Sequence, residues 1–291
     1  MDNITFMISV LCVCDDWLKG RKLRRRGPRP ILGDSEVLTM EIVGEFLGLD
    51  TDSGIFNYFR THYADWFPGV SHVHRTTFVR QAANLWAVKQ QIWQALIDWI
   101  EHDPMISIVD SFPVPVCRFA RAHRCRRLAG YTAFGKDDVA RQTFLGLRAH
   151  LRVGWPGVIV DFRLAPANVH ELQVAEELFE GVGGWVLGDR NYWKPELAEK
   201  GRLQGLYWLT PYRWASREPA PWPTWLKHKR YRIDTIFSQL VERFHAKRVW
   251  ARDAWHFWSR WLRKILSHTL AVFLCMQTGL PPLSFADLIT N

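Results

Sequence analysis

Two aspartates stand in apolar surroundings where a charge is unexpected. Asp110 interrupts the run MISIVDSFPVPV (105–116), and Asp189 ends the apolar part of the segment VLGDRNY. Buried carboxylates that lie close together repel each other, so at least one must be neutralised by a proton or a cation. Carboxylates are favoured ligands of Mg²⁺ and Mn²⁺, and a pair of such ions stabilises the attacking and leaving oxygens of a phosphoryl transfer. Asp110 and Asp189 are therefore the first candidates for a metal-dependent phosphoryl-transfer site.

A site of this kind usually needs a third carboxylate, and a predicted helix that starts near Arg230 offers two. At about 100° per residue, Asp234 lies on the flank of the apolar face of this helix, roughly 90° from its centre. Glu242 lies nearly opposite that face, at about 170°. The geometry prefers Asp234, with Glu242 as the alternative. Asp161, in the segment VIVDFRL, ranks lower because strand alternation directs it away from the apolar face.

The elements that must position these carboxylates form an α/β pattern between Asp103 and about residue 212. Three apolar, strand-like segments follow one another, and after them helices alternate with strands. This succession predicts a mixed five-stranded sheet with helices on its faces. The predicted strands are 105–117, 143–153, 157–166, 184–192 and 206–212, the predicted helices are 168–181 and 194–201, and a polar, arginine-rich bridge runs to about residue 140.

The rest of the chain is predicted to be helical. Residues 1–102 form an all-α region, in which 75–101 is one long amphipathic helix interrupted only by Lys89. Asp34 or Ser35 caps an earlier helix. The predicted domains are therefore 1–102 and 103–291. In the second, a Pro- and Trp-rich excursion at 213–229 precedes helices at 230–249 and 254–277.

Charge and cysteine content indicate the partner and the compartment. The formal net charge of +9 favours a polyanionic partner such as nucleic acid, and residues 19–30 contain seven Lys or Arg that form either a solvated linker or a phosphate-binding arm. Five cysteines without a CxxC pair argue for a reducing compartment. The N-terminus lacks the layout of a signal peptide, and no run of 18 apolar residues predicts a membrane span. We therefore expect a cytoplasmic protein that associates with the nucleoid when bound to DNA and has no contact with membranes.

Five segments together resemble the DDE-type transposases of bacterial insertion sequences, in particular a compact single-protein family. They are, in order, SIVDSFPVPVC, TFLGLRAHL, LAPANVHEL, VLGDRNYW and RYRIDTIFSQLVERF. The resemblance extends from residue 105 to about 275 and, weakly, to the helical N-terminus. It implies a ribonuclease H-like catalytic domain with Asp110 as the first acid and Asp189 as the second. The stretch from Arg230 to Asp234 matches the family signature of Arg, three residues and Glu, except that this chain has Asp where glutamate is usual.

The resemblance also implies a reaction and its partners. Two Mg²⁺ or Mn²⁺ ions would support cutting of double-stranded DNA at the element ends and joining of the resulting 3′-hydroxyl to target DNA. The N-terminal helices would recognise the ends, and joining two ends in one reaction suggests at least a homodimer on DNA. Expected phosphate contacts are Arg121, Arg124, Arg126, Arg127, Arg230, Arg232, Lys247 and Arg248.

Three other readings fit the same residues. A ribonuclease H-like nuclease would cut DNA without joining it. A non-catalytic DNA-binding relic would retain the fold but not the reaction. The aspartate at position 234, where the family usually has glutamate, is consistent with that interpretation. A different metal-dependent phosphoesterase would act on small phosphate substrates and would not need the basic helical N-terminus.

Overall fold

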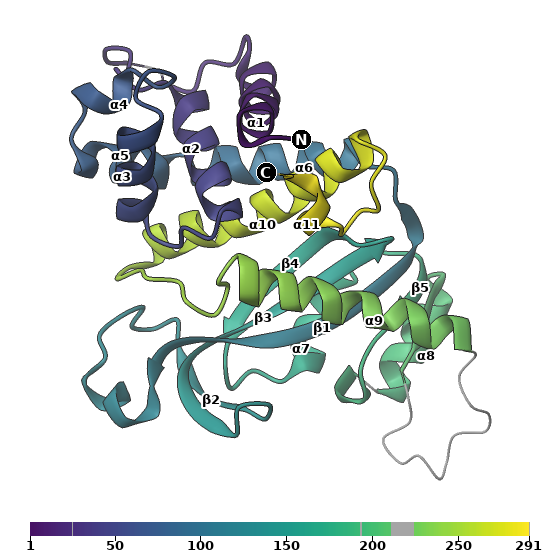
Figure 1. Ribbon diagram of the computed structural model, residues 1–291. Coiled ribbons are helices and arrows are strands. Elements are labelled where there is room, and N and C mark those ends of the chain that lie inside the picture. The colour runs from purple at the N-terminus through teal and green to yellow at the C-terminus, as the bar shows by residue number, and fades with distance from the viewer. Residues whose placement is uncertain (25, 193, 211–223, 291) are drawn as a thin grey trace. The chain divides into compact units, whose positions relative to one another are not determined.

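The computed structural model describes residues 1–24, 26–192, 194–210 and 224–290, and the chain folds into two compact units (Figure 1). The first unit, called the helical unit below, combines Met1–Trp99 with Leu240–Asn291. The second, the sheet unit, is Ile100–Gln239. These units divide the chain differently from the predicted domains, because the C-terminal helices belong with the N-terminal ones. The functional division into a DNA-binding region and a catalytic domain stays a prediction.

The helical unit is built around one long C-terminal helix, α10 (Ala254–Gln277), which packs against α6, α2 and α5. Most of α10 is buried on all sides. A helix that is largely apolar all round packs at the centre of a bundle, so this C-terminal helix forms the core around which the N-terminal helices pack. No helix among the described residues is long and apolar enough to cross a membrane. The other helices are α1 (Asn3–Leu18), α2 (Asp34–Phe46), α3 (Asp52–His62), α4 (Gly69–His72), α5 (Arg75–Asn84), α6 (Trp86–Trp99) and α11 (Phe285–Leu288).

The prediction of one long helix at 75–101 is wrong. The chain forms two helices there, and they separate at Leu85, whose backbone N–H bonds to the carbonyl oxygens of Gln81 and Ala82. Lys89, which the sequence pattern treated as an interruption of the apolar face, is completely buried. Its ammonium group lies 2.6 Å from a carboxylate oxygen of Glu41, so the charge is paired inside the core. The predicted cap also differs, since α2 begins at Asp34 and its N-cap is Gly33.

The sheet unit contains the predicted mixed α/β architecture, with helices flanking a strongly curved sheet (Figure 1). Its strands run in the order β4-β3-β1-β5-β6, and β1 pairs antiparallel with β3 but parallel with β5. A sixth strand, β2, lies in the segment that was predicted to be a polar bridge. It pairs with the start of β3. The strands are β1 (Asp103–Arg118), β2 (Ala133–Asp137), β3 (Gln142–Trp155), β4 (Val158–Pro166), β5 (Gly184–Leu187) and β6 (Leu206–Leu209).

Helices cover both faces of this sheet. On one face, α7 (Glu171–Leu178) and α8 (Pro195–Leu203) lie beside an apolar cluster that includes Val109 and Val186. On the other face, α9 (Thr224–Ser238) packs on β1 through the rings of Phe112 and Phe237, whose centroids are 4.9 Å apart. Residues 213–223 of the predicted Pro- and Trp-rich excursion lie outside the described residues. The remainder of that segment, from Thr224 onward, belongs to α9.

The two prolines of β1 mark the edge of the parallel part of the sheet. Pairing with β5 involves only Ile106–Ile108 of β1, whereas pairing with β3 continues to Arg118. Pro113 and Pro115 have the same parity along the strand, and neither has an N–H to donate. Proline within a strand is found at edges and bulges, and the β1–β3 register shifts between Pro115 and Cys117.

Candidate active site

The register of two neighbouring strands brings Asp110 and Asp189 together. In the parallel ladder, Ile106, Ser107 and Ile108 lie opposite Trp185, Val186 and Leu187. Extending this register by two residues aligns Asp110 of β1 with Asp189, which follows β5. Aligned residues of neighbouring strands point to the same face of a sheet. The ladder thus sets the two carboxylates side by side at the point where β5 ends.

Helix α9 covers the face toward which these carboxylates point. Alternation along β1 puts Asp110 on the same face as Phe112, which contacts Phe237 of α9. From α9, the guanidinium of Arg230 approaches Asp189, with 3.2 Å between Nη2 and Oδ1. Asp234 stands four residues further along α9, so it shares the face of Arg230. The structure therefore gathers Asp110, Asp189 and Asp234 around one guanidinium.

The electrostatics of this group favour a bound cation. Burial, and then the negative charge of Asp189, raise the pKa of Asp110 to about 7, although the backbone N–H of Ser111 and the charge of Arg230 act in the opposite direction. The pKa of Asp234 is also raised, by burial and by Asp189, while Arg230 lowers it. Among the described side chains, the guanidinium of Arg230 thus acts on all three carboxylates.

This donor set fits a divalent ion. Oxygen ligands that carry excess negative charge suit Mg²⁺ and Mn²⁺, which fill their remaining positions with water and phosphate oxygens. Within the described ranges, no three His, Cys, Asp or Glu side chains are already arranged to hold a metal ion. Asp189 is paired with Arg230 instead, so an entering ion would compete with that guanidinium.

The two candidates for the third acid lie in different units. Asp234 is in the sheet unit with Asp110 and Asp189, and its pKa responds to Asp189. Glu242 lies in a π-helical segment, Gln239–Arg243, and is an exposed residue of the helical unit. Asp161 is held elsewhere in the sheet, on β4, by Arg163 at 2.5 Å. Of the candidates for the third acid, the sheet unit therefore brings Asp234 to the pair of aspartates.

Sequence reasoning missed Glu171, the first residue of α7. Its Oε1 accepts hydrogen bonds from Ser111 Oγ at 2.7 Å and from Arg148 Nη1 at 3.1 Å. Arg148 also donates to Ser111 Oγ, at 3.2 Å. Ser111 follows Asp110 directly, and its backbone N–H donates to the Asp110 carboxylate at 2.7 Å. Glu171 thus fixes the strand residue that orients Asp110. The sequence did contain a signal, because Glu171 falls in LAPANVHEL, one of the five segments of the family resemblance.

Two further buried polar residues lie behind the same part of the sheet. His150 is opposite Ser111 on β3, and its Nδ1 is 3.3 Å from the hydroxyl of Tyr192. Burial and the neighbouring Arg148 lower the pKa of His150 to about 3, so the imidazole stays neutral at ordinary pH. Burial raises the pKa of Tyr192 well above its usual value, which keeps the phenol protonated. These residues support the strand without adding charge to the site.

If Asp110 is a metal ligand, as the sequence predicts, Glu171→Gln should lower metal-dependent DNA cleavage about 10- to 100-fold, the usual effect of removing a group that orients such a ligand. The amide keeps the shape of the side chain but weakens its bonds to Ser111 and Arg148. The cleavage rate as a function of Mg²⁺ concentration measures the effect. Glu176→Gln, an exposed carboxylate on the same helix, serves as the control. Equal rates for both variants would show that Glu171 has no part in positioning Asp110.

The predicted phosphate contacts fall into three groups. Arg121 and Arg124, in a 3₁₀ turn (Phe119–Arg124), and Arg126 just after it are exposed, whereas Arg127 is half-buried and donates to the Val116 carbonyl oxygen at 3.2 Å. On α9, Arg230 pairs with Asp189, and the guanidinium of Arg232 lies 5.2 Å from the centre of the Trp155 ring.

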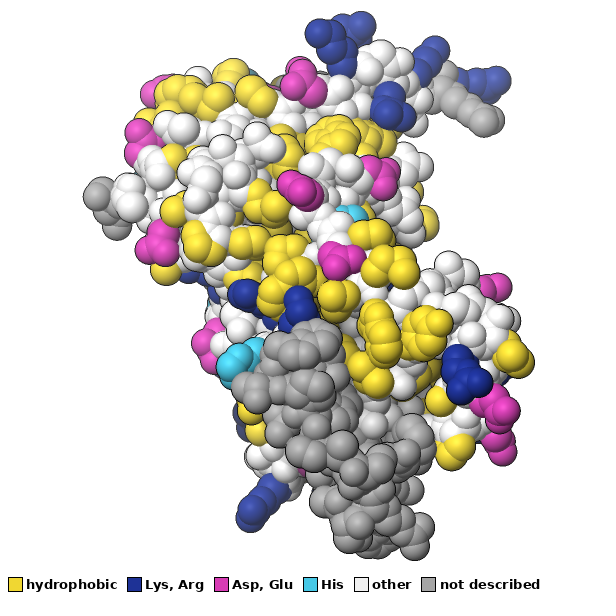
Figure 2. Space-filling view, turned by 90° about the vertical axis from the view of Figure 1, so that its right-hand side faces the viewer, with side chains coloured by type: hydrophobic (Ala, Val, Ile, Leu, Met, Phe, Trp, Pro, Cys, Tyr) yellow, Lys and Arg dark blue, Asp and Glu magenta, His cyan; other side chains and the backbone are white. Residues whose placement is uncertain are grey.

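The third group belongs to the helical unit. Lys247 is half-buried there and Arg248 is exposed. In the basic connector at 19–30, Arg24 is paired with Asp34. Figure 2 shows a gathering of Lys and Arg side chains at the top of the view, on the surface of the helical unit. The assignment of all these residues to DNA stays a prediction.

Comparison with known proteins gives one family match and one structural match. Residues 101–249, just over half of the 291-residue chain, match the family described as Transposase DDE domain. The cryo-EM structure of a piggyBac transposase synaptic complex with hairpin DNA is similar over 100% of this chain and 86% of that chain, with 8% sequence identity and a TM-score of 0.46. No curated protein matches the sequence.

Proposed function

Since this chain belongs to the transposase DDE domain family, we propose that it cuts the ends of an insertion sequence and joins them to target DNA by metal-dependent phosphoryl transfer. The alignment of Asp110 with Asp189 through the β1–β5 register is the observation that supports this most strongly. Two neighbouring carboxylates, one of which has a raised pKa because it is buried near the other, suit a divalent ion. A small-phosphate phosphoesterase would leave the positively charged helical unit without a role.

In this proposal, Asp110, Asp189 and Asp234 would hold two Mg²⁺ or Mn²⁺ ions. Ions bound there would stabilise the charge on the attacking and leaving oxygens at phosphorus. Glu171 and Ser111 orient Asp110 from the opposite face of β1. Arg230, which pairs with Asp189 in this structure, would be placed to contact a DNA phosphate at the same site. Exposed arginines of the sheet unit and the basic side chains of the helical unit position the duplex, and the complex with DNA is at least a homodimer.

The reaction can be tested with labelled DNA that carries the sequences flanking the gene for this chain, together with a supercoiled target plasmid. We expect cleavage that leaves a 3′-hydroxyl, followed by joined products, only when Mg²⁺ or Mn²⁺ is present. Cleavage without joined products would favour a nuclease. Binding to the flanking DNA without cleavage in either metal would overturn the enzymatic proposal and leave a DNA-binding relic.

The identity of the third acid can be tested in the same assay. We expect Asp234→Asn to lower cleavage by about 10²- to 10³-fold, since it removes one charged group from the site, and Glu242→Gln to leave cleavage unchanged. Both substitutions preserve side-chain shape and remove one negative charge, so each is the matched control for the other. The reverse outcome would assign the third role to Glu242.

A further inference from the structure

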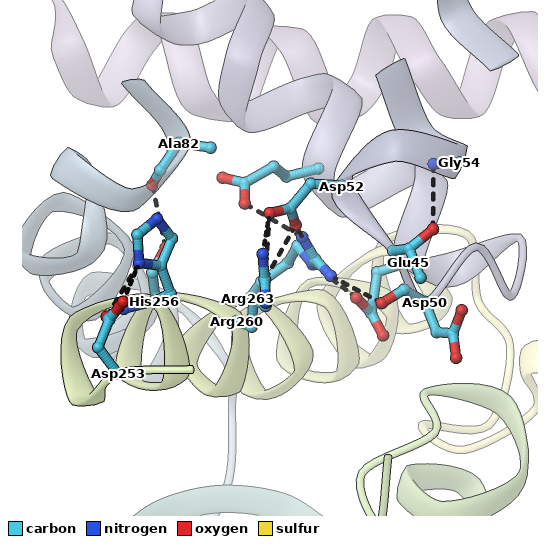
Figure 3. Close-up of polar contacts among 12 residues, drawn as sticks. Glu45, Asp50, Asp52, Gly54, Ala82, Asp253, His256, Arg260 and Arg263 are labelled. Atoms are coloured by element: carbon cyan, nitrogen blue, oxygen red, sulfur yellow. Dashed lines mark hydrogen bonds and ion pairs between the residues drawn. The ribbon is translucent and has the colours of Figure 1, made fainter. Parts of the chain in front are cut away.

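The helical unit contains a cavity of about 670 Å³ that shares no residue with the carboxylate site. The starts of α3, α5 and α10 and the side chain of Trp250 line it. Figure 3 shows part of its wall, where Asp52, Arg260 and His256 come from α3 and the first turns of α10. A cavity of this volume is within the range of small-ligand sites, so it can take one nucleotide but not a DNA duplex.

Two cations at this cavity have no acidic partner in the part of the chain that the structure describes. Arg75 and Arg80 of α5 are both exposed and both line the cavity. Asp52, which also lines it, is already neutralised: its carboxylate lies 2.5 Å from Arg260 Nη2 and 2.8 Å from Arg263 Nη1. Burial would raise the pKa of Asp52, but these two guanidiniums hold it well below its usual value. Asp50 also lines the cavity and accepts a hydrogen bond from the neutral indole of Trp250, so it offsets one of the two arginine charges. The charge that remains is positive and suits a phosphate group.

Two indole rings offer flat surfaces at the same cavity. Trp250 is 55% exposed, although its Nε1 donates a hydrogen bond to Asp50 Oδ2 at 3.2 Å. Trp255 is 39% exposed and packs edge-on against the ring of His256, with 4.9 Å between the ring centroids. His256 is in turn held by Asp253, with 2.9 Å between Nδ1 and each carboxylate oxygen. These rings are fixed in place before any ligand arrives, which lowers the entropic cost of stacking on them.

The helix starts by themselves do not make this a binding site. Side chains already cap them, with Thr51 accepting from the Gly54 N–H, His74 from the Thr76 N–H and Asp253 from the His256 N–H. The guanidiniums and the indoles are the groups left to meet a ligand. Cations beside exposed aromatic faces are the combination that binds unpaired nucleic-acid bases and their phosphates.

We propose that this cavity binds an unpaired nucleotide of a DNA strand, with its phosphates at Arg75 and Arg80 and its base stacked on Trp250 or Trp255. Bases within a duplex are stacked on each other and cannot present a face to an indole, so the nucleotide must be unpaired. The choice of DNA rests on the proposed function. The chemistry of the site requires only a base attached to a phosphate.

The test is binding of the full-length chain, in EDTA, to a short fluorescent oligothymidylate and to the same strand carrying abasic sites. We expect Trp250→Ala to weaken binding of the intact strand about tenfold and to leave binding of the abasic strand unchanged. We expect Arg75→Ala with Arg80→Ala to reduce the slope of log K against log salt by about 1.4, since each phosphate contact on a single strand contributes about 0.7.

Matched controls lie in the same unit. Trp66 is as exposed as Trp250, at 54%, and Arg60 is an exposed arginine at the other end of α3, so Trp66→Ala and Arg60→Ala should leave binding unchanged. Trp250→Phe, which retains a stacking ring, should preserve most of the affinity and shows that loss in the alanine variant is not misfolding. Equal affinity for intact and abasic strands, or equal losses in the control variants, would overturn the inference.

Two further comparisons distinguish this inference from binding of free nucleotides and from the proposed reaction. If thymidine monophosphate competes as well as the oligonucleotide, the cavity binds free nucleotides and the assignment to a DNA strand is overturned. Because the assay contains no metal, it does not depend on cleavage. If the chain binds as expected but does not cut DNA, this inference stands and the proposed reaction is overturned. If the chain cuts DNA but binds equally in all variants, this inference is overturned and the proposed reaction stands.

Discussion

Asp110→Asn is expected to abolish metal-dependent DNA cleavage and, at the same time, to raise the melting temperature of the metal-free protein. Cleavage should fall about 10³-fold or more, because the substitution removes a charge that holds the metal ions in the proposed function. Stability should rise because the carboxylate of Asp110 is buried next to Asp189 without full compensation. A gain in stability together with a loss of activity is the expected signature of a group retained for catalysis.

The pH dependence of this gain follows from the direction of the pKa shift. The pKa of Asp110 is about 7 in the folded protein, against an ordinary value of 3.8, so ionisation of this group opposes folding. The wild type suffers no penalty below about pH 4, and the penalty grows as the pH rises to 7 and is complete above it. Asp110→Asn should therefore match the wild type at pH 4 and exceed it by roughly 2 kcal/mol at pH 8, after allowance for solvent screening.

Thermal melting in EDTA from pH 4 to 8 measures this difference, and added Mg²⁺ should stabilise the wild type but not the variant. Asp161→Asn is the control, since Asp161 lies in the same sheet but is paired with Arg163. It should keep cleavage activity and should not become more stable. If Asp110→Asn were less stable than the wild type at pH 8, the carboxylate would be compensated in the fold and the electrostatic reasoning for a cation site would fail.

Arg263→Met should destabilise the protein by about 3–5 kcal/mol, the usual cost of removing one partner from a buried ion pair. Arg263 is completely buried on α10, and its Nε lies 2.6 Å from Glu45 and its Nη1 2.8 Å from Asp52 (Figure 3). Methionine fills much of the same volume, so the loss comes mainly from the buried ion pairs that the guanidinium makes with Glu45 and Asp52. Glu45 keeps its contact with Lys264 and Asp52 its contact with Arg260, but each carboxylate loses one charged hydrogen-bond donor in the core.

Urea unfolding at pH 7 measures this loss. Arg60→Met, an exposed position on α3, should change the free energy of unfolding by no more than about 0.5 kcal/mol. Glu45→Gln should cost less when it is added to Arg263→Met than when it is made in the wild type, because the ion pair between Arg263 and Glu45 is then already lost. A loss below about 1 kcal/mol for Arg263→Met would mean that water or a rearranged lysine replaces the guanidinium.

The sequence by itself determined the local features of this protein. Apolar runs with alternating or helical period identified the strands that contain Asp110 and precede Asp189, and the helix that contains Asp234. These features depend on residues close in the chain, where propensity and periodicity act directly. The resemblance to DDE transposases rested on short segments of the same kind, and the family match confirms it.

Only the tertiary structure decided which distant residues meet. The register that aligns Asp110 with Asp189, the contact of Glu171 with Ser111 and the pairing of Lys89 with Glu41 all join residues far apart in the chain. The sequence pattern treated Lys89 as an interruption of an apolar face, because a single sequence does not show that Glu41 of another helix is its partner. Likewise, α10 looked like the end of a catalytic domain but packs into the helical unit. Pairing between distant segments depends on how elements pack, and that free energy has no local pattern in the sequence.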